Sequence, residues 1–134
     1  MAERPAAGLL DTSVVVDLDI IDGDLLPLTV GVSAITMAEL GAGPAATSDS
    51  AERARRQDRL QRAEAAFEAI PFGPDAARAY GRVYAAVVTV GRQPRRRFAD
   101  LLIAATAVAE RLPLVTRNPE DFMGLDGLLD VIEV

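Results

Sequence analysis

Four acidic side chains lie at positions from which carboxylates could act together. Asp11 directly follows a short apolar run, and Asp121 lies shortly after another at residues 114–116. Glu39 and Asp100 lie in stretches rich in small apolar residues, which predict helices with packed surfaces. Carboxylates that converge on one cleft repel one another and take up protons unless a cation lies between them. Because oxygen-only ligands select hard divalent ions, the four acids predict a Mg²⁺ or Mn²⁺ site.

Each acid taken alone also has an ordinary structural explanation. An aspartate directly after a strand is often a helix cap, so Asp11 could serve only that purpose. Asp100 could stabilise a helix macrodipole, and Asp121 could be a surface acid in a turn. Glu39 is harder to explain in this way, because its chain neighbours are alanine and leucine. The metal-site hypothesis therefore depends on the four acids together.

The composition narrows the chemistry further. The 134 residues include no histidine, cysteine or lysine, and all 14 basic residues are arginine. The sequence thus lacks the side chains for a Ser-His-Asp triad, a thiolate nucleophile, a disulfide, a sulfur-rich zinc site or a Schiff base. If the protein is an enzyme, carboxylates and an oxygen-bound metal ion must do the work, with water as the nucleophile.

Net charge and the N-terminal residues limit the remaining classes of protein. The net charge of -6 argues against nonspecific coating of nucleic acid, because it repels a polyanion. Glu3, Arg4 and Pro5 argue against a signal peptide, and no segment approaches the roughly 20 apolar residues of a membrane span. We expect a soluble cytoplasmic protein with a single domain over residues 1–134.

Short apolar runs alternate with helical patterns along the chain. The runs at 8–10, 30–32, 114–116 and 131–132 predict buried strands. The first expected helix is 14–18, with Thr12 or Ser13 as its cap, and the second begins after Ser33 as its cap and ends at residues 41–44. Further helices are expected at 51–70, which Pro71 ends, at 74–91 and at 100–112, with a short turn or helix at 119–122. This order predicts a three-layer α/β/α sandwich with a mostly parallel sheet, in which ligands bind beyond the carboxyl ends of the strands.

Four segments in order resemble the motifs of PIN-domain ribonucleases. They are 10–15 (LDTSVV), 32–40 (VSAITMAEL), 100–107 (DLLIAATA) and 115–122 (VTRNPEDF), and the resemblance extends over roughly residues 8–133. The similarity is strongest to the VapC toxins of bacterial type II toxin–antitoxin pairs. It implies Mg²⁺- or Mn²⁺-dependent cleavage of RNA by activated water, a VapB-type antitoxin that blocks the acidic site, and toxin homodimers.

The resemblance also implies roles for individual residues. Asp11, Glu39 and Asp100 would bind the metal directly or through water. Asn118, Glu120 and Asp121 are all close enough in sequence to reach the same site; Asp121 is expected as the fourth ligand, with Asn118 ranked second. Other polar side chains would orient the carboxylates or bound water: Thr12 or Ser13, and Thr116 or Asn118.

Two groups of arginines could offset the acidic charge locally. Arg95, Arg96 and Arg97 lie just before Asp100, and we predict that they contact RNA phosphate, because a guanidinium binds phosphate through two hydrogen bonds. The other group, on the helix expected from residue 51, alternates with acids at a spacing of four, which favours a solvated helix face. The amphipathic helices within residues 51–90 are candidate surfaces for the antitoxin or a second toxin.

Other classes of protein share part of this pattern. A receiver-like phosphoacceptor domain needs a lysine beside its aspartate, which this chain lacks. A haloacid-dehalogenase-type phosphatase needs a second aspartate two residues after Asp11, where Ser13 stands. The remaining alternative is a catalytically silent PIN-like module that binds RNA or protein, and the presence of all four acids favours the active enzyme.

Overall fold

A sheet of four parallel strands lies at the centre of the structure, a computed structural model that describes residues 4–134. Its strand order is β2 (Thr29–Val32), β1 (Ala7–Leu10), β3 (Leu114–Thr116) and β4 (Val131–Glu133). Every neighbouring pair is parallel. The predicted α/β class and all four predicted strands are therefore confirmed. Glu3, used above against a signal peptide, lies outside the described residues.

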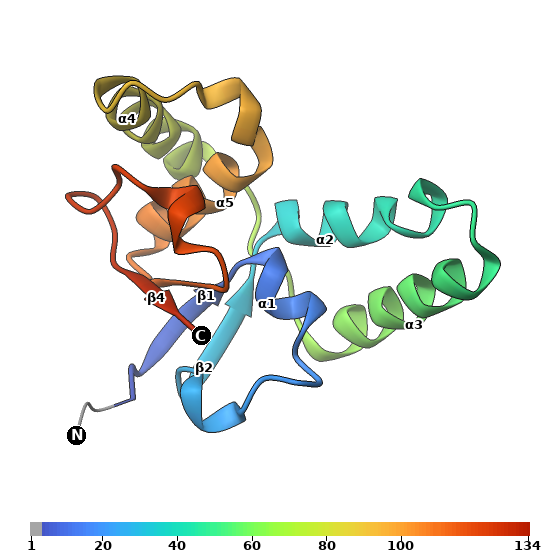
Figure 1. Cartoon of the computed structure of the whole chain (residues 1–134). Coiled ribbons are helices and arrows are strands. Elements are labelled where there is room, and N and C mark those ends of the chain that lie inside the picture. Colours follow the sequence, from blue (N-terminus) through green and yellow to red (C-terminus); the bar gives the residue numbers. More distant parts are fainter. Residues whose placement is uncertain (1–3) are drawn as a thin grey trace.

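Helices cover both faces of this sheet (Figure 1). They are α1 (Thr12–Val16), α2 (Ala34–Ala42), α3 (Ser50–Ala66), α4 (Pro74–Thr89) and α5 (Phe98–Glu110). Short 3-10 turns are η1 (Gly23–Leu25), η2 (Pro44–Ala46), η3 (Pro94–Arg97) and η4 (Pro119–Phe122). None of the helices within residues 4–134 is long and apolar enough to cross a membrane.

Alternate residues of the strands supply two separate cores. Leu9 and Leu114 are fully buried against α4 and α5, whereas Leu10 and Val115 are fully buried on the side of α1, α2 and α3. This alternation follows from the two-residue period of a β-strand, which points successive side chains to opposite faces. A sheet buried on both faces has only its edges and strand ends available for polar function.

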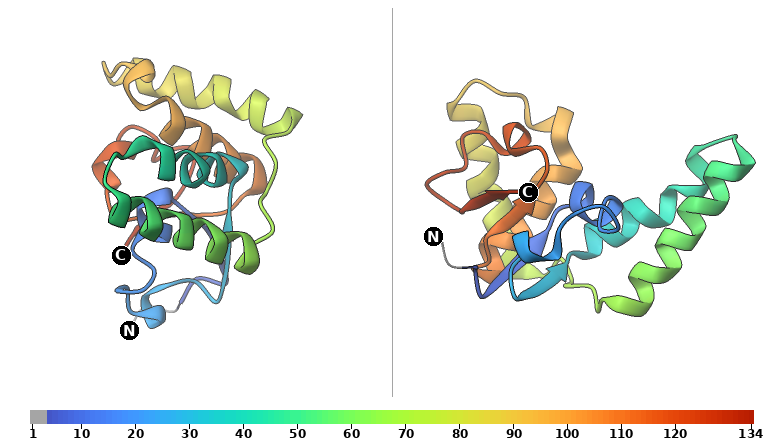
Figure 2. Two further views of the ribbon diagram at one scale, coloured as in Figure 1. Left: turned by 90° about the vertical axis from the view of Figure 1, so that its right-hand side faces the viewer. Right: turned by 60° about the horizontal axis from the view of Figure 1, so that its bottom comes forward.

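Helices α2 and α3 form a hairpin that reaches away from the sheet (Figures 1 and 2). Its turn is stabilised locally, because Arg56 donates from Nη1 to the Gly43 carbonyl at 2.9 Å. The Asp49 carboxylate caps α3 by accepting from the backbone N–H of Glu52 at 3.2 Å. The hairpin thus extends one side of the molecule without adding to the sheet.

Two local predictions were wrong. Helix α3 ends at Ala66, not at residue 70, because Ile70 forms a parallel bridge with Ser33 beside the sheet. Neither Thr12 nor Ser13 caps α1; the N-cap position belongs to Asp11, whose side chain makes no capping hydrogen bond. The predicted cap at Ser33 is confirmed, since its hydroxyl accepts from the Thr36 N–H at 3.1 Å.

Candidate active site

Asp11 lies at the carboxyl end of β1, between the end of this strand and the start of α1. Its backbone N–H still donates to the Val115 carbonyl of β3 at 2.8 Å, so the sheet fixes its position. The side chain is only 3% exposed. Its Oδ2 accepts from Ser13 Oγ at 2.7 Å and from Thr116 Oγ1 at 2.9 Å, whereas the buried Oδ1 has no partner within the described residues. One oxygen of Asp11 is therefore held and the other is left for a ligand.

The two hydroxyls that hold Asp11 are themselves oriented by the backbone. Ser13 Oγ accepts from the Arg117 N–H at 3.2 Å, and Thr116 Oγ1 accepts from the Asn118 N–H at 3.0 Å. Each hydroxyl therefore directs its single proton toward the carboxylate. Asn118 itself acts here through its backbone N–H.

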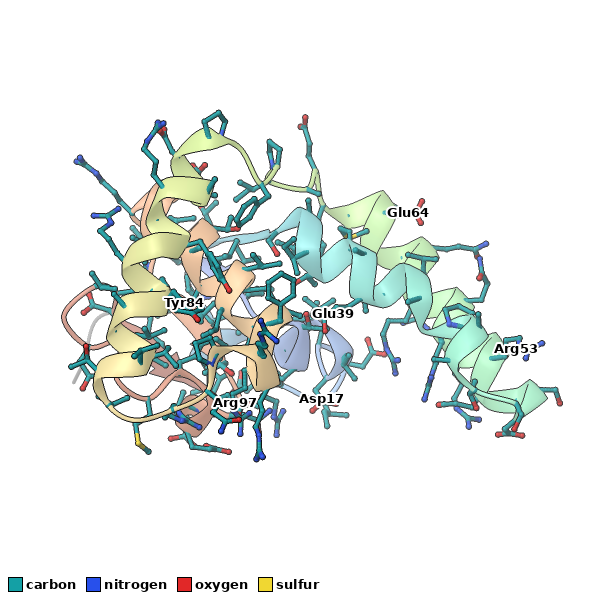
Figure 3. The ribbon with its side chains drawn as sticks, turned by 90° about the horizontal axis from the view of Figure 1, so that it is seen from above. Asp17, Glu39, Arg53, Glu64, Tyr84 and Arg97 are labelled. Carbon is teal, nitrogen blue, oxygen red and sulfur yellow. The ribbon has the colours of Figure 1, made fainter. Side chains whose placement is uncertain are left out.

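Glu39 comes from the second turn of α2 and is exposed, as is its neighbour Ala38. The expectation of a packed surface around Glu39 is therefore wrong: α2 buries Thr36 and Leu40 instead. The carboxylate is nonetheless held, because Thr12 Oγ1 donates to its Oε1 at 2.7 Å. Figure 3 shows Glu39 on the side of α2 that faces the main body, whereas Arg53 and Glu64 lie out on the hairpin.

A hydroxyl chain behind Glu39 was missed by the sequence reasoning. The hydroxyls of Thr12 and Thr36 lie 3.0 Å apart, and Ser33 Oγ donates to Thr36 Oγ1 at 3.4 Å. Since Thr12 gives its proton to Glu39, Thr36 is the donor to Thr12. Thr36 precedes Glu39 by three residues on one helix face, and this spacing is the signal that could have found it.

Asp100 lies in the first turn of α5, as predicted, and is half-buried. The pKa of Asp100 is raised to about 6, first by burial and then by the negative charges of Asp11, Asp121 and Glu39, in that order of importance. Arg97 acts in the opposite direction. The four predicted acids therefore lie close enough to act on one another, although they come from four different parts of the chain.

Asp121 lies in η4 and forms an ion pair with Arg97, in η3 just before α5. The positive charge of Arg97 also acts on Asp100, and Figure 3 places Arg97 on the same side of the molecule as Glu39. The sequence places these two residues 24 positions apart, so the pair could not have been read from local spacing. Of the three arginines predicted to contact phosphate, Arg97 is thus partly engaged, whereas Arg95 and Arg96 are exposed.

The donor atoms of this site fit a hard divalent cation. The uncommitted ligands are carboxylate oxygens, and the buried Oδ1 of Asp11 lacks a hydrogen-bond partner in the described part of the chain. The raised pKa of Asp100 indicates uncompensated negative charge. Within residues 4–134, however, no three acidic side chains are gathered closely enough to hold one ion as they stand. Mg²⁺ in proteins is commonly held by one or two carboxylates, with water among the remaining ligands.

Comparison with known proteins places this arrangement in a family. The PIN domain pattern matches residues 9–127. Ribonuclease VapC5 of Mycobacterium tuberculosis (strain ATCC 25618 / H37Rv) is 38% identical over 134 residues, which cover 98% of this chain and 96% of that protein. The chain is a PIN-domain protein of the VapC family. The predicted family is therefore confirmed.

Further similarity extends to another VapC protein and to a solved complex. VapC ribonuclease Y4jK of Sinorhizobium fredii (strain NBRC 101917 / NGR234) is 39% identical over 103 residues, covering 73% of this chain and 72% of that protein. The crystal structure of VapBC-5, a member of the VapBC family of toxin-antitoxin systems from Mycobacterium tuberculosis, matches with a TM-score of 0.84 and 38% identity. That match covers 97% of this chain and 100% of the other, so the VapC fold extends over nearly the whole molecule.

Proposed function

We propose that this VapC-family protein is a Mg²⁺- or Mn²⁺-dependent endoribonuclease and the toxin of a toxin–antitoxin pair. The observation that carries the proposal is the buried carboxylate of Asp11, whose Oδ1 has no hydrogen-bond partner within residues 4–134 and whose charge, with those of Asp121 and Glu39, acts on Asp100. The relatives named ribonucleases support RNA as the substrate. The absence of histidine, cysteine and lysine supports water rather than a side chain as the nucleophile.

Asp11, Glu39, Asp100 and Asp121 would hold the ion or ions. When bound, such an ion polarises a phosphodiester oxygen and lowers the pKa of a water molecule. Ser13 and Thr116 hold Oδ2 of Asp11 by two hydrogen bonds and so fix its rotamer, which leaves Oδ1 for the ion. Thr12 does the same for Glu39. Arg97 holds Asp121 and supplies positive charge close to where an RNA phosphate would lie.

The proposal is tested with purified protein free of any partner. Panels of tRNA, rRNA and mRNA are incubated with Mg²⁺, with Mn²⁺, and with EDTA. We expect internal cleavage that either metal supports and EDTA abolishes. Cleavage that survives EDTA would contradict the metal dependence, and failure to cleave any RNA with either metal, in protein that still binds RNA, would favour the silent binding module.

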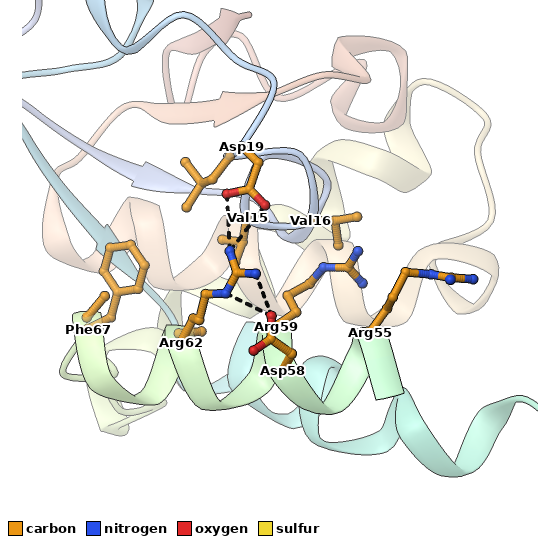
Figure 4. Close-up of a pocket in the computed structure, with 11 residues that line it drawn as sticks. Val15, Val16, Asp19, Arg55, Asp58, Arg59, Arg62 and Phe67 are labelled. Carbon is orange, nitrogen blue, oxygen red and sulfur yellow. Dashed lines mark hydrogen bonds and ion pairs between the residues drawn. The ribbon is translucent and has the colours of Figure 1, made fainter. Parts of the chain in front are cut away.

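The partner proposed for this toxin is a VapB-type antitoxin, since the matched structures of 28% identity or more include the VapBC-5 complex and FitAcB of Neisseria gonorrhoeae. A groove between α1 and α3, with a volume of about 310 Å³, offers an apolar floor that includes Val15 and Phe67 (Figure 4). Arg55 and Arg59 line the same groove. We propose that it takes an antitoxin segment with apolar side chains flanked by acids.

The groove is tested by Val16→Glu, which places a charge in its partly exposed wall. We expect this variant to lose copurification with a coexpressed antitoxin while it still cleaves RNA. A variant that retains the antitoxin would exclude the groove.

The expected homodimer is also a proposal, supported by the exposed apolar side chains Tyr84, Val88 and Phe98, and its test is the mass in solution by light scattering.

A further inference from the structure

A second polar hollow lies beside the acidic site, between the end of α4, η3 and η4. Its volume is about 480 Å³. Its walls carry Arg92, Arg96, Arg97, Gln93 and Asp121, and its floor includes the apolar side chains of α4 and α5. Three guanidinium groups against a single carboxylate make this hollow positively charged, in a protein whose net charge is -6. Such local reversal of charge favours an anionic ligand.

The arginines of this hollow are positioned differently from one another. Arg92 is anchored, because its Nη1 donates to the Glu120 carbonyl at 2.7 Å and so ties the end of α4 to η4. Arg97 is paired with Asp121. Arg96 is exposed and has no ion pair with any residue from 4 to 134. Its five N–H donors are therefore available to a ligand.

The hollow is continuous with the acidic site through two shared residues. Asp121 belongs to both, and Arg97, which contacts it, also acts on the charge of Asp100. A ligand in the hollow therefore lies directly beside whatever the carboxylates hold. In a nucleic acid strand, the anionic group nearest to one phosphate along the backbone is the next phosphate.

We propose that this hollow binds a phosphodiester group of the RNA strand adjacent to the one that is cleaved, with Arg96 as the principal contact. The inference rests on the proposed ribonuclease function and specifies how its substrate is held. A guanidinium suits this ligand, because its planar fork makes two parallel hydrogen bonds to phosphate oxygens. For Arg95 the proposal replaces the phosphate contact expected from the sequence, because Arg95 lies in the same 3-10 turn but does not line the hollow.

Arg95 therefore provides a matched control for Arg96. Both are exposed and both substitutions remove one charge from the same turn, so Arg96→Gln and Arg95→Gln differ only in whether the hollow is changed. The measurement is steady-state cleavage of a fluorogenic single-stranded RNA with Mg²⁺ over a range of salt concentrations. Arg96→Lys tests whether the forked geometry matters beyond the charge.

We expect Arg96→Gln to raise KM about tenfold with little change in kcat, as for loss of a contact made equally in ground and transition states. The slope of log(kcat/KM) against log salt should become shallower by about 0.7, the value for one phosphate of a single strand. Arg95→Gln should change KM less than about twofold, and Arg96→Lys should fall between the two.

A second variant adds charge to the hollow without removing an arginine. Gln93→Glu places a carboxylate in its wall and should raise KM in the same direction as Arg96→Gln. If the wild type cleaves RNA and Arg95→Gln and Arg96→Gln have equal effects on KM, the proposed phosphate contact in the hollow is overturned, while the ribonuclease function stands. A wild type that fails to cleave any RNA would overturn the proposed function, and the hollow with it.

Discussion

The acids of helix α3 and the four acids of the candidate site, called here the acids at the sheet edge, have the same chemistry and opposite surroundings. On α3, Glu52 lies 3.2 Å from Arg55 and 3.8 Å from Arg56, and Asp58 is paired with Arg62. These pairs are largely exposed and local in sequence, so each contributes little to stability. At the sheet edge, Asp11 is buried, and its side-chain partners within residues 4–134 are the hydroxyls of Ser13 and Thr116. Burial and three like charges raise the pKa of Asp100.

This difference distinguishes a solvated surface from a candidate site. On α3, Glu52 and Asp58 are neutralised by arginines three or four residues away. Charges at the sheet edge are brought together from distant parts of the chain without a matching number of cations, an arrangement that destabilises the protein unless a ligand compensates it. The following predictions contrast the two regions, beginning with the largest effect.

Neutralising an acid of the site should abolish cleavage, whereas the same change on α3 should not. We expect Asp11→Asn or Asp100→Asn to lower kcat/KM by about 10³-fold or more, because several kcal/mol of transition-state stabilisation are lost. Asp58→Asn serves as the control and should stay near the wild-type value. Measured kcat/KM with Mg²⁺ decides the matter, and equal losses at Asp58 and Asp100 would remove the distinction between the two regions.

The fourth acid can be separated from its chain neighbour. Asp121 is partly buried and paired with Arg97, whereas Glu120 is exposed. Asp121→Ala should therefore reduce cleavage by about 100-fold, and Glu120→Ala by less than about threefold. If the order were reversed in the same cleavage assay, the fourth ligand would have to be Glu120.

The hydroxyls that hold Asp11 should matter less than the carboxylate itself. Thr116→Val and Ser13→Ala each remove one hydrogen bond to Oδ2, and loss of such a supporting contact costs about tenfold to 100-fold in metal affinity or activity. Thr106→Val is the matched control, since its buried hydroxyl bonds only to the Leu102 carbonyl within α5. An equal loss of activity in the control would indicate a general packing defect.

Removing the carboxylate charge of Asp100 should stabilise the protein without metal, because burial first and the like charges of its neighbours second disfavour that charge. The pKa of Asp100 is about 6 in the fold, above the usual value near 4, so its contribution is favourable at pH 4 and is lost as pH rises through 6. In EDTA, Asp100→Asn should match the wild type near pH 4 and melt about 3 °C higher at pH 7.5, a small difference because Asp100 is partly exposed. Thermal unfolding followed by circular dichroism at the two pH values measures this difference in melting temperature. A variant that melts lower than the wild type at pH 7.5 would contradict the claim that the Asp100 charge destabilises the fold.

The sheet and most helices could be predicted because the patterns that define them are local. The continuous apolar runs that form β1 and β3, and the cap at Ser33, are visible in the sequence. The end of α3 could not be predicted, because Ile70 leaves its helical pattern to pair with Ser33, a contact that depends on the finished sheet.

The residues of the candidate site could be predicted from the sequence, but their exposure, ion pairs and hydrogen bonds could not. Asp11 has the same sequence signature whether it caps a helix or faces a ligand, and only the folded structure shows that its carboxylate makes no capping bond. The exposure of Glu39 and the pairing of Asp121 with Arg97 depend on how distant elements pack together. The metal itself stays a prediction, as does residence in the cytoplasm.

Binding of Mn²⁺ measured by isothermal titration calorimetry tests the central claim most directly, because it needs no RNA. At pH 7.5 the wild type and Asp58→Asn should bind Mn²⁺ saturably, and Asp11→Asn and Asp100→Asn should not. At pH 5 the wild type should bind more weakly, since the pKa of Asp100 lies near 6 and its proton competes with the ion. Equal binding by the wild type and Asp11→Asn, or no binding by either, would contradict the account.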